Sequence, residues 1–416
     1  MRVELDESRR QSVGRLLGHA SRSIAAYGLP LLMAIANRSA LATMCVCACL
    51  CIASEWVQAG SFRATVSKFL PRPSSEFFLV IAFVAVAALS YAWSIARRET
   101  AFGLSEMLIA LVAGYVVVVG LTTYARGVLL NHLCLAMIIC EAYIILDLHF
   151  DMAVRRLIGM RLETSQYNRG VETLAMYAAP VITALAIGPR QALLWIALAA
   201  VGAAALASES GAGVLALAAA GTTSLFARSN LTIARWIALI VALAALVTAP
   251  FIGEALRALN SDSLHRALSG AHVAERVDIW RAFGFLALKF LPFGSGFATS
   301  YQTTAQNFLM DAAPELRHLL LWHPHHALLQ VWVELGLAGA LLMGCIIWRV
   351  FRRVAELDRE PQIAALTLLA SIGSIALTAH SAWQGAWMAA TAGAIAMSHM
   401  IWRAPDDGVR SNFRFI

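Results

Sequence analysis

The chain has 416 residues, of which 60% are hydrophobic and 14% are charged. Soluble domains carry about 25% charged residues, so this composition excludes a soluble globular protein and predicts a polytopic membrane protein. The formal net charge of +7 is typical of basic residues that fix the orientation of membrane spans, and it is weak support for nucleic-acid binding.

Twelve apolar segments predict twelve membrane-spanning helices. A span needs roughly 20 apolar residues, and inside lipid only helices satisfy the backbone groups of a single segment. The first two segments are short and poorly separated by Asn37 and Arg38, which leaves ten or eleven spans as alternatives. The segments lie near residues 23–36, 39–55, 76–94, 102–122, 128–148, 170–187, 191–207, 211–227, 231–250, 326–349, 363–380 and 383–402. The expected fold is an all-α transmembrane bundle, with a polar segment 1–22 before it and a tail 403–416 after it.

The distribution of Lys and Arg predicts that both termini are cytoplasmic. With this orientation most basic loops, including the run from Arg349 to Arg359, lie inside. The outer exceptions are Arg38, the pair 97–98 and the segment 149–169, which contains four arginines. The last of these is the largest departure from the charge rule, and it invites a functional interpretation.

One long segment, 251–325, connects two predicted spans at the outer, periplasmic face. Apolar residues at i, i+3 and i+4 in stretches such as 274–290 predict amphipathic helices that lie on the membrane. Long connections are usually functional when they occur in compact proteins. Metal-dependent sugar transferases usually present an Asp-x-Asp pair, whereas Asp262, Asp278 and Asp311 are isolated here.

Histidines cluster where this long segment meets the span 326–349. Pro324 is expected in the first helical turn, where its missing N–H is harmless. A neutral imidazole of His323 or His325 is suited to take a proton from a hydroxyl group, because its pKa lies near working pH. The alternative is that these histidines only cap the helix at the membrane interface.

The helix that follows the histidines carries polar residues on one face. His326, Gln330 and Glu334 are spaced by four residues, so they share a face and are candidates for substrate contacts. An ionisable residue inside a span suggests a function, here the orientation of His325 by Glu334 or Gln330. The alternative is that Glu334 pairs with an arginine or a backbone group of a neighbouring helix.

Two arginines at the outer face suggest an anion-binding site. Arg276 lies in the long segment and Arg169 at the outer end of the predicted span 170–187. A guanidinium grips phosphate oxygens with two parallel hydrogen bonds, so two of them suit a diphosphate. The alternative for each arginine is binding of lipid headgroups. Trp280 and Trp322 are candidate sugar platforms, although tryptophan is also common at membrane interfaces.

Four segments together resemble one family, the bacterial O-antigen ligase and polymerase group. "RVDIWRAFGFLALKFLPFGSGF" is similar to its Arg-x-x-x-Trp stretch and Pro-x-Gly-x-Gly turn, and "HPHHALLQVWVELGLAGALL" to its His-x-His-Asn-x-x-Leu-Gln signature. "ALSYAWSIARRETAF" resembles its Ser-x-x-Trp-Ser turn, and "YNRGVETLAMYAAPV" its Asn-Arg-Gly helix start. The resemblance extends over about residues 80–350.

The resemblance implies an inner-membrane glycosyltransferase of the helical GT-C type with a periplasmic active site. Such an enzyme takes a glycan from undecaprenyl diphosphate without a metal or other cofactor. It passes the glycan, with inversion, to lipid A–core as a ligase or to another repeat unit as a polymerase. The family's histidine falls on His325 and its arginines on Arg276 and Arg169, while His323, His326, Gln330, Glu334 and Trp280 are expected to contact substrate.

The chain departs from the family pattern at two positions. His326 stands where the family usually has Asn. The turn Ser210-Gly211-Ala212 lacks the basic residue that many members have there, and Glu209 precedes it.

Other functions remain as alternatives. O-antigen polymerase and exopolysaccharide polymerase are alternatives within the family. A secondary transporter or flippase is an alternative from another class, supported by Glu141 and Asp147 in the predicted span 128–148.

Overall fold

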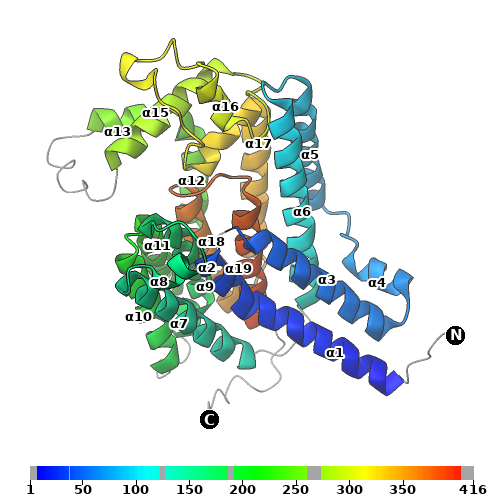
Figure 1. Ribbon diagram of the computed structural model, residues 1–416. Coiled ribbons are helices and arrows are strands. Elements are labelled where there is room, and N and C mark those ends of the chain that lie inside the picture. Colours follow the sequence, from blue (N-terminus) through cyan, green and yellow to red (C-terminus); the bar gives the residue numbers. More distant parts are fainter. Residues whose placement is uncertain (1–6, 37, 122–126, 186–191, 260–272, 404–416) are drawn as a thin grey trace.

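The structure is a computed structural model that describes residues 7–36, 38–121, 127–185, 192–259 and 273–403 (Figure 1). Within these ranges the regular secondary structure is helical, without strands. Six helices there are long and apolar enough to cross a membrane, judged by length and composition. They are Ala40–Ala59, Ser75–Ala92, Arg97–Leu121, Leu130–His149, Leu231–Leu259 and Ala327–Ala355. The predicted fold class, a polytopic helical membrane protein, is confirmed.

Every one of the twelve predicted apolar segments contains a helix. Those outside the six candidates are shorter or less apolar. The main elements are α1 (Glu7–Ser23), α2 (Leu29–Ile35), α3 (Ala40–Ala59), α4 (Phe62–Phe69), α5 (Ser75–Leu89), α6 (Arg97–Leu121), α7 (Gly127–His149), α8 (Ala153–Leu157), α9 (Asn168–Leu185), α10 (Ala192–Ala207), α11 (Gly211–Ser229), α12 (Leu231–Thr248), α13 (Ile252–Leu259), α15 (Val273–Lys289), α16 (Ser300–Ala305), α17 (Ala327–Ala355), α18 (Arg359–Ala376) and α19 (Gly385–Arg403).

The N-terminal helix begins earlier than the sequence suggests. α1 starts at Glu7 and continues through a π-helical turn, Ile24–Gly28, into α2. Its small residues bond the neighbouring helix α3: Ser21 Oγ donates to the Cys47 carbonyl at 3.0 Å, and Ser54 Oγ donates to the Gly14 carbonyl at 2.7 Å. These contacts between α1 and α3 stabilise a polar segment that lacks an apolar run of its own.

Helix α9 is the centre of the largest core. Nearly all of its residues are buried, among them Tyr177, whose hydroxyl donates to the Ala25 carbonyl. Helices α2, α7, α10, α11, α18 and α19 pack around it. Gly170 permits the closest approach, because a Cβ there would lie 2.8 Å from the Cα of Ala34 in α2. The first turn of α9 is thereby fixed, and with it the position of Arg169.

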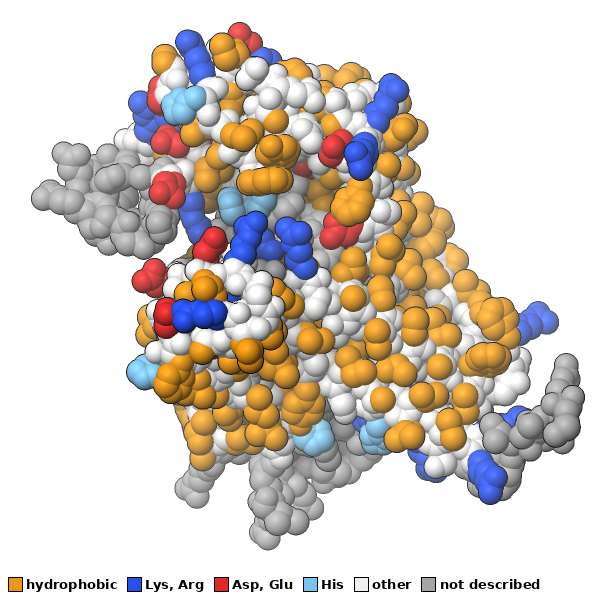
Figure 2. Space-filling view, in the orientation of Figure 1, with side chains coloured by type: hydrophobic (Ala, Val, Ile, Leu, Met, Phe, Trp, Pro, Cys, Tyr) orange, Lys and Arg blue, Asp and Glu red, His pale blue; other side chains and the backbone are white. Residues whose placement is uncertain are grey.

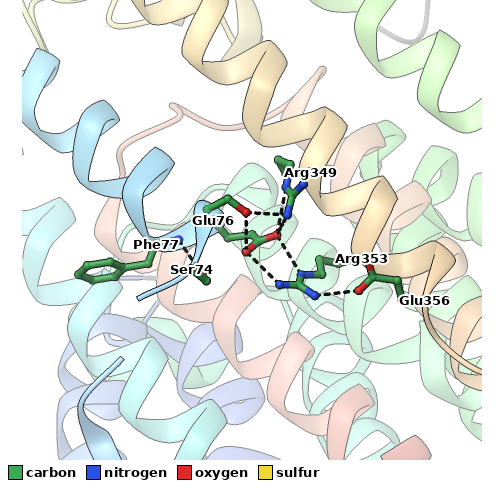
Figure 3. Close-up of polar contacts among 7 residues, drawn as sticks. Ser74, Glu76, Phe77, Arg349, Arg353 and Glu356 are labelled. Carbon is green, nitrogen blue, oxygen red and sulfur yellow. Dashed lines mark hydrogen bonds and ion pairs between the residues drawn. The ribbon is translucent and has the colours of Figure 1, made fainter. Parts of the chain in front are cut away.

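Helices α5 and α17 are antiparallel neighbours, and ion pairs between their side chains join them at one end. Glu76, at the start of α5, accepts hydrogen bonds from Arg349 and Arg353 near the end of α17, at 2.6 and 2.9 Å (Figure 3). Arg353 also pairs with Glu356 at 2.8 Å. The opposite ends of the two helices therefore lie together, and the histidine-rich segment is at that end (Figure 1).

In its described part, the long segment 251–325 contains the α-helices α13, α15 and α16, and it shares a hydrophobic core with α17. Its described part lies at one end of the molecule, where α13, α15 and α16 are grouped (Figure 1). Phe283 and Leu286 of α15 are fully buried and pack with Leu329 and Val333 of α17. Buried Arg281 bonds three carboxylates, those of Glu254, Asp278 and Glu315. The predicted helix 274–290 is confirmed as α15, and its buried face packs against protein.

Candidate functional site

Helix α17 is interrupted at Gly336, and the turn after α15 fills the gap. Gly336 has φ 58° and ψ −146°, a conformation that side chains other than hydrogen do not tolerate. The break frees the carbonyls of Val333 and Glu334, which accept from the backbone N–H groups of Ser295 and Gly296 at 2.9 and 3.0 Å. The Leu337 N–H donates in turn to the Pro292 carbonyl at 2.9 Å. The Pro-x-Gly-x-Gly segment, residues 292–296, thus forms a turn, and it docks into a broken helix.

Glu334 holds this junction together. Its fully buried carboxylate accepts hydrogen bonds from the N–H of Ala298 at 2.7 Å, from both the N–H and hydroxyl of Ser300, and from Gln330 Nε2 at 2.9 Å. The indole N–H of Trp383 is a fifth donor. A buried charge needs such donors, because it loses its hydration on folding. The alternative named for Glu334, pairing with backbone groups outside its own helix, is therefore observed.

The Ser-x-x-Trp-Ser turn after α5 also packs against this junction. Ser90 Oγ accepts from the N–H of Phe297 at 2.9 Å, and the N–H of Ile95 donates to the Ser295 carbonyl at 3.1 Å. A Cβ on Gly296 would lie 2.6 Å from Ser94 Oγ, so the two turns touch directly. We call these contacting parts, residues 90–95, 292–300, 330–337 and 381–383, the Glu334 junction.

His325 lies beside the Glu334 junction in a left-handed backbone conformation, with φ 51°. Its Nδ1 is 2.8 Å from the carbonyl oxygen of Ala379, in the turn between α18 and α19. A carbonyl only accepts, so Nδ1 carries the proton and Nε2 of the neutral ring keeps its lone pair. Burial and the nearby Arg276 charge lower the pKa of His325, against the opposing effect of the Ala379 carbonyl. The neutral ring is thus favoured, with Nε2 able to accept a proton.

In the other two histidines, the Nδ1 lone pair accepts a hydrogen bond from the backbone. His323 Nδ1 accepts from the N–H of His325 at 3.2 Å, and His326 Nδ1 accepts from the N–H of Leu329 at 3.1 Å, capping α17. Burial lowers the pKa of His326 to about 4 and that of His323 well below its ordinary value. In their neutral forms the proton of both rings is on Nε2, so among the three histidines only His325 presents a free basic nitrogen.

Pro324 precedes the helix instead of lying in its first turn, which corrects the expectation from sequence. His326 is the N-cap of α17, and the first helical residue is Ala327. The Pro324 carbonyl accepts from the indole of Trp280 at 3.0 Å, and the Trp280 ring meets His326 edge-on at 5.8 Å. These contacts of Trp280 fix the loop that presents His325.

Gln330 and Glu334 do not hydrogen-bond His325. The Gln330 side chain donates to Ser381 Oγ and Glu334, and accepts from the N–H of Ala382. The orientation of His325 comes instead from Ala379. The predicted orienting role is wrong, because the polar atoms of both buried side chains bond other partners.

Arg276 and Arg169 approach the histidines from two further elements. Arg276 Nη1 of α15 donates to the Thr378 carbonyl, one residue before the carbonyl that holds His325. Arg276 is close enough to influence His325 electrostatically, and Arg169 of α9 influences His323. Burial lowers the pKa of Arg276, an effect opposed by Glu172. Thus three segments distant in sequence meet at one place.

Two residues of this group were missed from sequence. Glu172, one turn after Arg169 in α9, has a carboxylate oxygen 2.6 Å from His380 Nε2, and both residues are buried. Glu172 also attracts both Arg169 and Arg276. The available signal was an ionisable residue in the "NRGVETL" helix start, together with a histidine in an uncharged turn.

One turn, residues 378–383, organises both halves of this region. Its first three residues hold Arg276, His325 and Glu172, in that order. Its last three hold Gln330 and Glu334. We call His325, His323, Arg276, Arg169, Glu172 and His380 the histidine–arginine cluster.

The two acidic residues that favoured a transporter lie elsewhere, in α7. Asp147 accepts from the hydroxyls of Tyr143 and Tyr167 and from the Val154 N–H. Glu141 is fully buried, and neither carboxylate oxygen has a hydrogen-bond partner in the described part of the chain. Asp147 is therefore a structural residue at the end of α7.

Part of the chain that includes these residues matches a known protein family. Residues 192–344 match the model of a family described as O-antigen ligase. The resemblance noted in the sequence is confirmed for this segment. The matched segment includes Arg276, the turn 292–300, His325 and Glu334. Arg169 and Glu172 lie before it.

Curated proteins that are similar to this chain carry related names. Proteins of Rickettsia typhi and Rickettsia prowazekii, each named "Putative polysaccharide ligase", are 29% identical over 120 residues, which is 28% of this chain and 29% of theirs. A protein of Rickettsia conorii with the same description is 28% identical over 121 residues, 28% of each chain. The chain thus aligns with less than a third of the length of these relatives.

Proposed function

We propose that this protein is a membrane glycosyltransferase that moves a glycan from undecaprenyl diphosphate to an acceptor sugar at the periplasmic face. An O-antigen ligase, with lipid A–core as the acceptor, is the function that the O-antigen ligase match supports best. The observation that carries the proposal is the meeting of His325, Arg276 and Arg169 from three separate elements. The names of the three relatives point in the same direction.

The chemistry follows from the assigned proton positions. His325 Nε2 takes the proton of an acceptor hydroxyl while its oxygen attacks the anomeric carbon of the donor glycan. The bond between that carbon and the diphosphate oxygen breaks on the opposite face, so the configuration inverts. Arg276 and Arg169 bind the diphosphate and neutralise the charge that grows on it as it leaves. This scheme routes no step through a metal or other cofactor.

The surroundings support each role. Ala379 fixes the tautomer of His325, as an orienting group does in other acid–base catalysts. Among the described residues, the Arg169 guanidinium has no hydrogen-bond or ion-pair partner, so its donors are available to a ligand. The Glu172 carboxylate attracts both arginines, and this attraction offsets part of their mutual repulsion before the anion binds.

The substrate-binding roles proposed for the remaining residues are more indirect. His323 lines the approach to His325, with ring centroids 4.0 Å apart. The segment that carries His325 is positioned by His326, Gln330, Glu334 and Trp280. Replacing one of them would therefore alter substrate binding by displacing His325. The inner membrane, with cytoplasmic termini, is the proposed location.

The surface polysaccharide of a deletion strain distinguishes ligase from polymerase. A ligase predicts loss of all long-chain lipopolysaccharide with accumulation of lipid-linked polymer, whereas a polymerase predicts a single attached repeat. Complementation with the wild-type chain should restore the pattern, and His325→Ala should not, at equal protein level. His318→Ala, a change at an exposed histidine in the segment 251–325, is the matched control and should complement fully. A normal pattern in the deletion strain would overturn the proposal.

A further inference from the structure

A basic pocket lies beside the histidine–arginine cluster. It has a volume of about 380 Å³ and is lined by four arginines, Arg38, Arg155, Arg161 and Arg169. The other lining residues are Ile35, Ala36, Met160 and Gln166, so no carboxylate is among the described residues that line it. We call this the four-arginine pocket. On the face in Figure 2, basic side chains gather at a hollow in which histidine atoms are also visible.

Arg155 is built into the wall of the four-arginine pocket. It is 2% exposed, its Nη2 donates to the Ala34 carbonyl at 3.1 Å, and its guanidinium lies over the Tyr167 ring at 4.2 Å. Its buried Nε has no hydrogen-bond partner among the described residues. A buried donor without a partner costs free energy, and an anion entering the pocket would supply one.

Two of the four arginines of the pocket carry charge that is not paired in the described part of the chain. Arg38 and Arg161 are exposed, and neither has an ion-pair partner in the described part of the chain. Arg38 repels Arg169 electrostatically. The same residues, Arg38 and those of segment 149–169, are among the outer exceptions to the rule that places basic residues inside. Clustered, unneutralised guanidinium groups at an outer face are typical of a phosphate-binding site.

The donor diphosphate does not account for all of these guanidinium groups. Arg276 completes the proposed diphosphate site with Arg169, and the two share the attraction of Glu172. Arg276 is not among the residues that line the four-arginine pocket. Arg38, Arg155 and Arg161 line the four-arginine pocket with Arg169 and are not part of the proposed donor site.

We propose that the four-arginine pocket binds a phosphate group of the second substrate, a phosphorylated acceptor glycolipid. This proposal rests on the proposed function, because it requires two lipid-borne substrates. Binding there holds the acceptor near Arg169, so that its hydroxyl reaches His325. Forked hydrogen bonds from several arginines give the pocket a preference for phosphate over a neutral sugar.

The test uses the purified full chain in phosphatidylcholine nanodiscs, with lipid-linked glycan as donor. The acceptor probes are phosphorylated lipid A–core glycolipid and the same glycolipid after phosphatase treatment. The variant is the double change Arg38→Gln and Arg161→Gln. The matched control is Arg97→Gln with Arg98→Gln, which removes two exposed arginines at the other outer site.

We expect the pocket variant to raise the KM for the phosphorylated acceptor by about 10-fold, which corresponds to about 1.4 kcal/mol of binding free energy. The donor KM and kcat should stay within about 2-fold of wild type. The dephosphorylated acceptor should bind wild type and variant equally, and the control should behave as wild type. An unchanged acceptor KM, a raised donor KM, or the same loss in the control would overturn the proposal.

A direct binding measurement separates failure of the pocket from failure of the proposed function. If wild type transfers no glycan but still prefers the phosphorylated glycolipid, and the variant loses that preference, the pocket stands and the enzyme function is wrong. Adding phosphatidylglycerol to the nanodiscs tests ordinary headgroup binding. If this lipid abolishes the preference, the pocket is a general lipid site and the proposal fails.

Discussion

Two polar regions meet at the start of α17, and they differ in how their charges are satisfied. At the Glu334 junction a single buried carboxylate receives five donors from three segments. In the histidine–arginine cluster, His325 Nε2 and the Arg169 guanidinium have no hydrogen-bond partner in the described part of the chain. The turn 378–383 belongs to both regions. A saturated network thus fixes the position of an unsaturated one, as catalytic sites on rigid supports require.

The largest expected effect is loss of the fold when the junction loses its carboxylate. Glu334→Leu leaves five buried donors without their acceptor, and we expect a loss of about 3–5 kcal/mol in the free energy of unfolding. The measurement is the thermal midpoint of the purified protein in nanodiscs. Glu209→Gln, at an exposed turn, is the control and should leave the midpoint unchanged. An equal midpoint for Glu334→Leu would show that the junction is not saturated as described.

A somewhat smaller effect is expected at the break in α17. A Cβ on Gly336 would lie 2.2 Å from the Pro292 carbonyl oxygen, and φ is positive there. Gly336→Ala should therefore cost about 2–4 kcal/mol of unfolding free energy through strain and displacement of the turn. In Gly202→Ala the new Cβ meets nothing within 4 Å, and we expect no loss. If the two variants have the same thermal midpoint, the break in α17 is not needed for stability.

In the histidine–arginine cluster the expected effects are on rate and not on stability. Arg276→Lys keeps the positive charge but loses the planar fork, and we expect transfer to fall by about 10-fold or more. The thermal midpoint should stay near that of wild type. Arg257→Lys, at an exposed ion pair with Glu315, is the charge-matched control. A fully active Arg276→Lys variant would mean that simple attraction of the anion suffices.

The smallest effect concerns pH. Burial and Arg276 lower the pKa of His325, and the base is active in its neutral form. Transfer should therefore remain constant as pH falls to about 6.5, the ordinary pKa of histidine, and decline only below it. The measurement is kcat/KM against pH. Half-maximal activity at or above pH 6.5 would contradict the assigned environment of His325.

The positions of the helices were predictable from the sequence, but their interruptions were not. Each apolar segment contains a helix because lipid and core both demand one. The stretch around Gly336 reads as a continuous span, since its side chains give no sign that another turn replaces the missing hydrogen bonds. The start of α1 was missed because its stability comes from contacts with α3, such as Ser21 with Cys47.

The site was predictable only in part. His325, Arg276 and Arg169 are candidates from local motifs, and the structure brings them close enough to interact electrostatically with the histidines. Glu172 and His380 were missed because their contact joins α9 to the α18–α19 turn across 208 positions of sequence. The orientation of His325 by the Ala379 carbonyl was equally hidden, because a backbone group leaves no signature in the residue types.

The central claim is that His325 acts as a base together with the two arginines. Its most direct test is the transfer rate of purified His325→Ala, Arg169→Gln and the double variant, each with an intact thermal midpoint. We predict a loss of about 100-fold or more for His325→Ala, and a further loss in the double variant far below the product of the single losses. Full activity of His325→Ala, or strictly multiplicative losses in the double variant, would contradict the account.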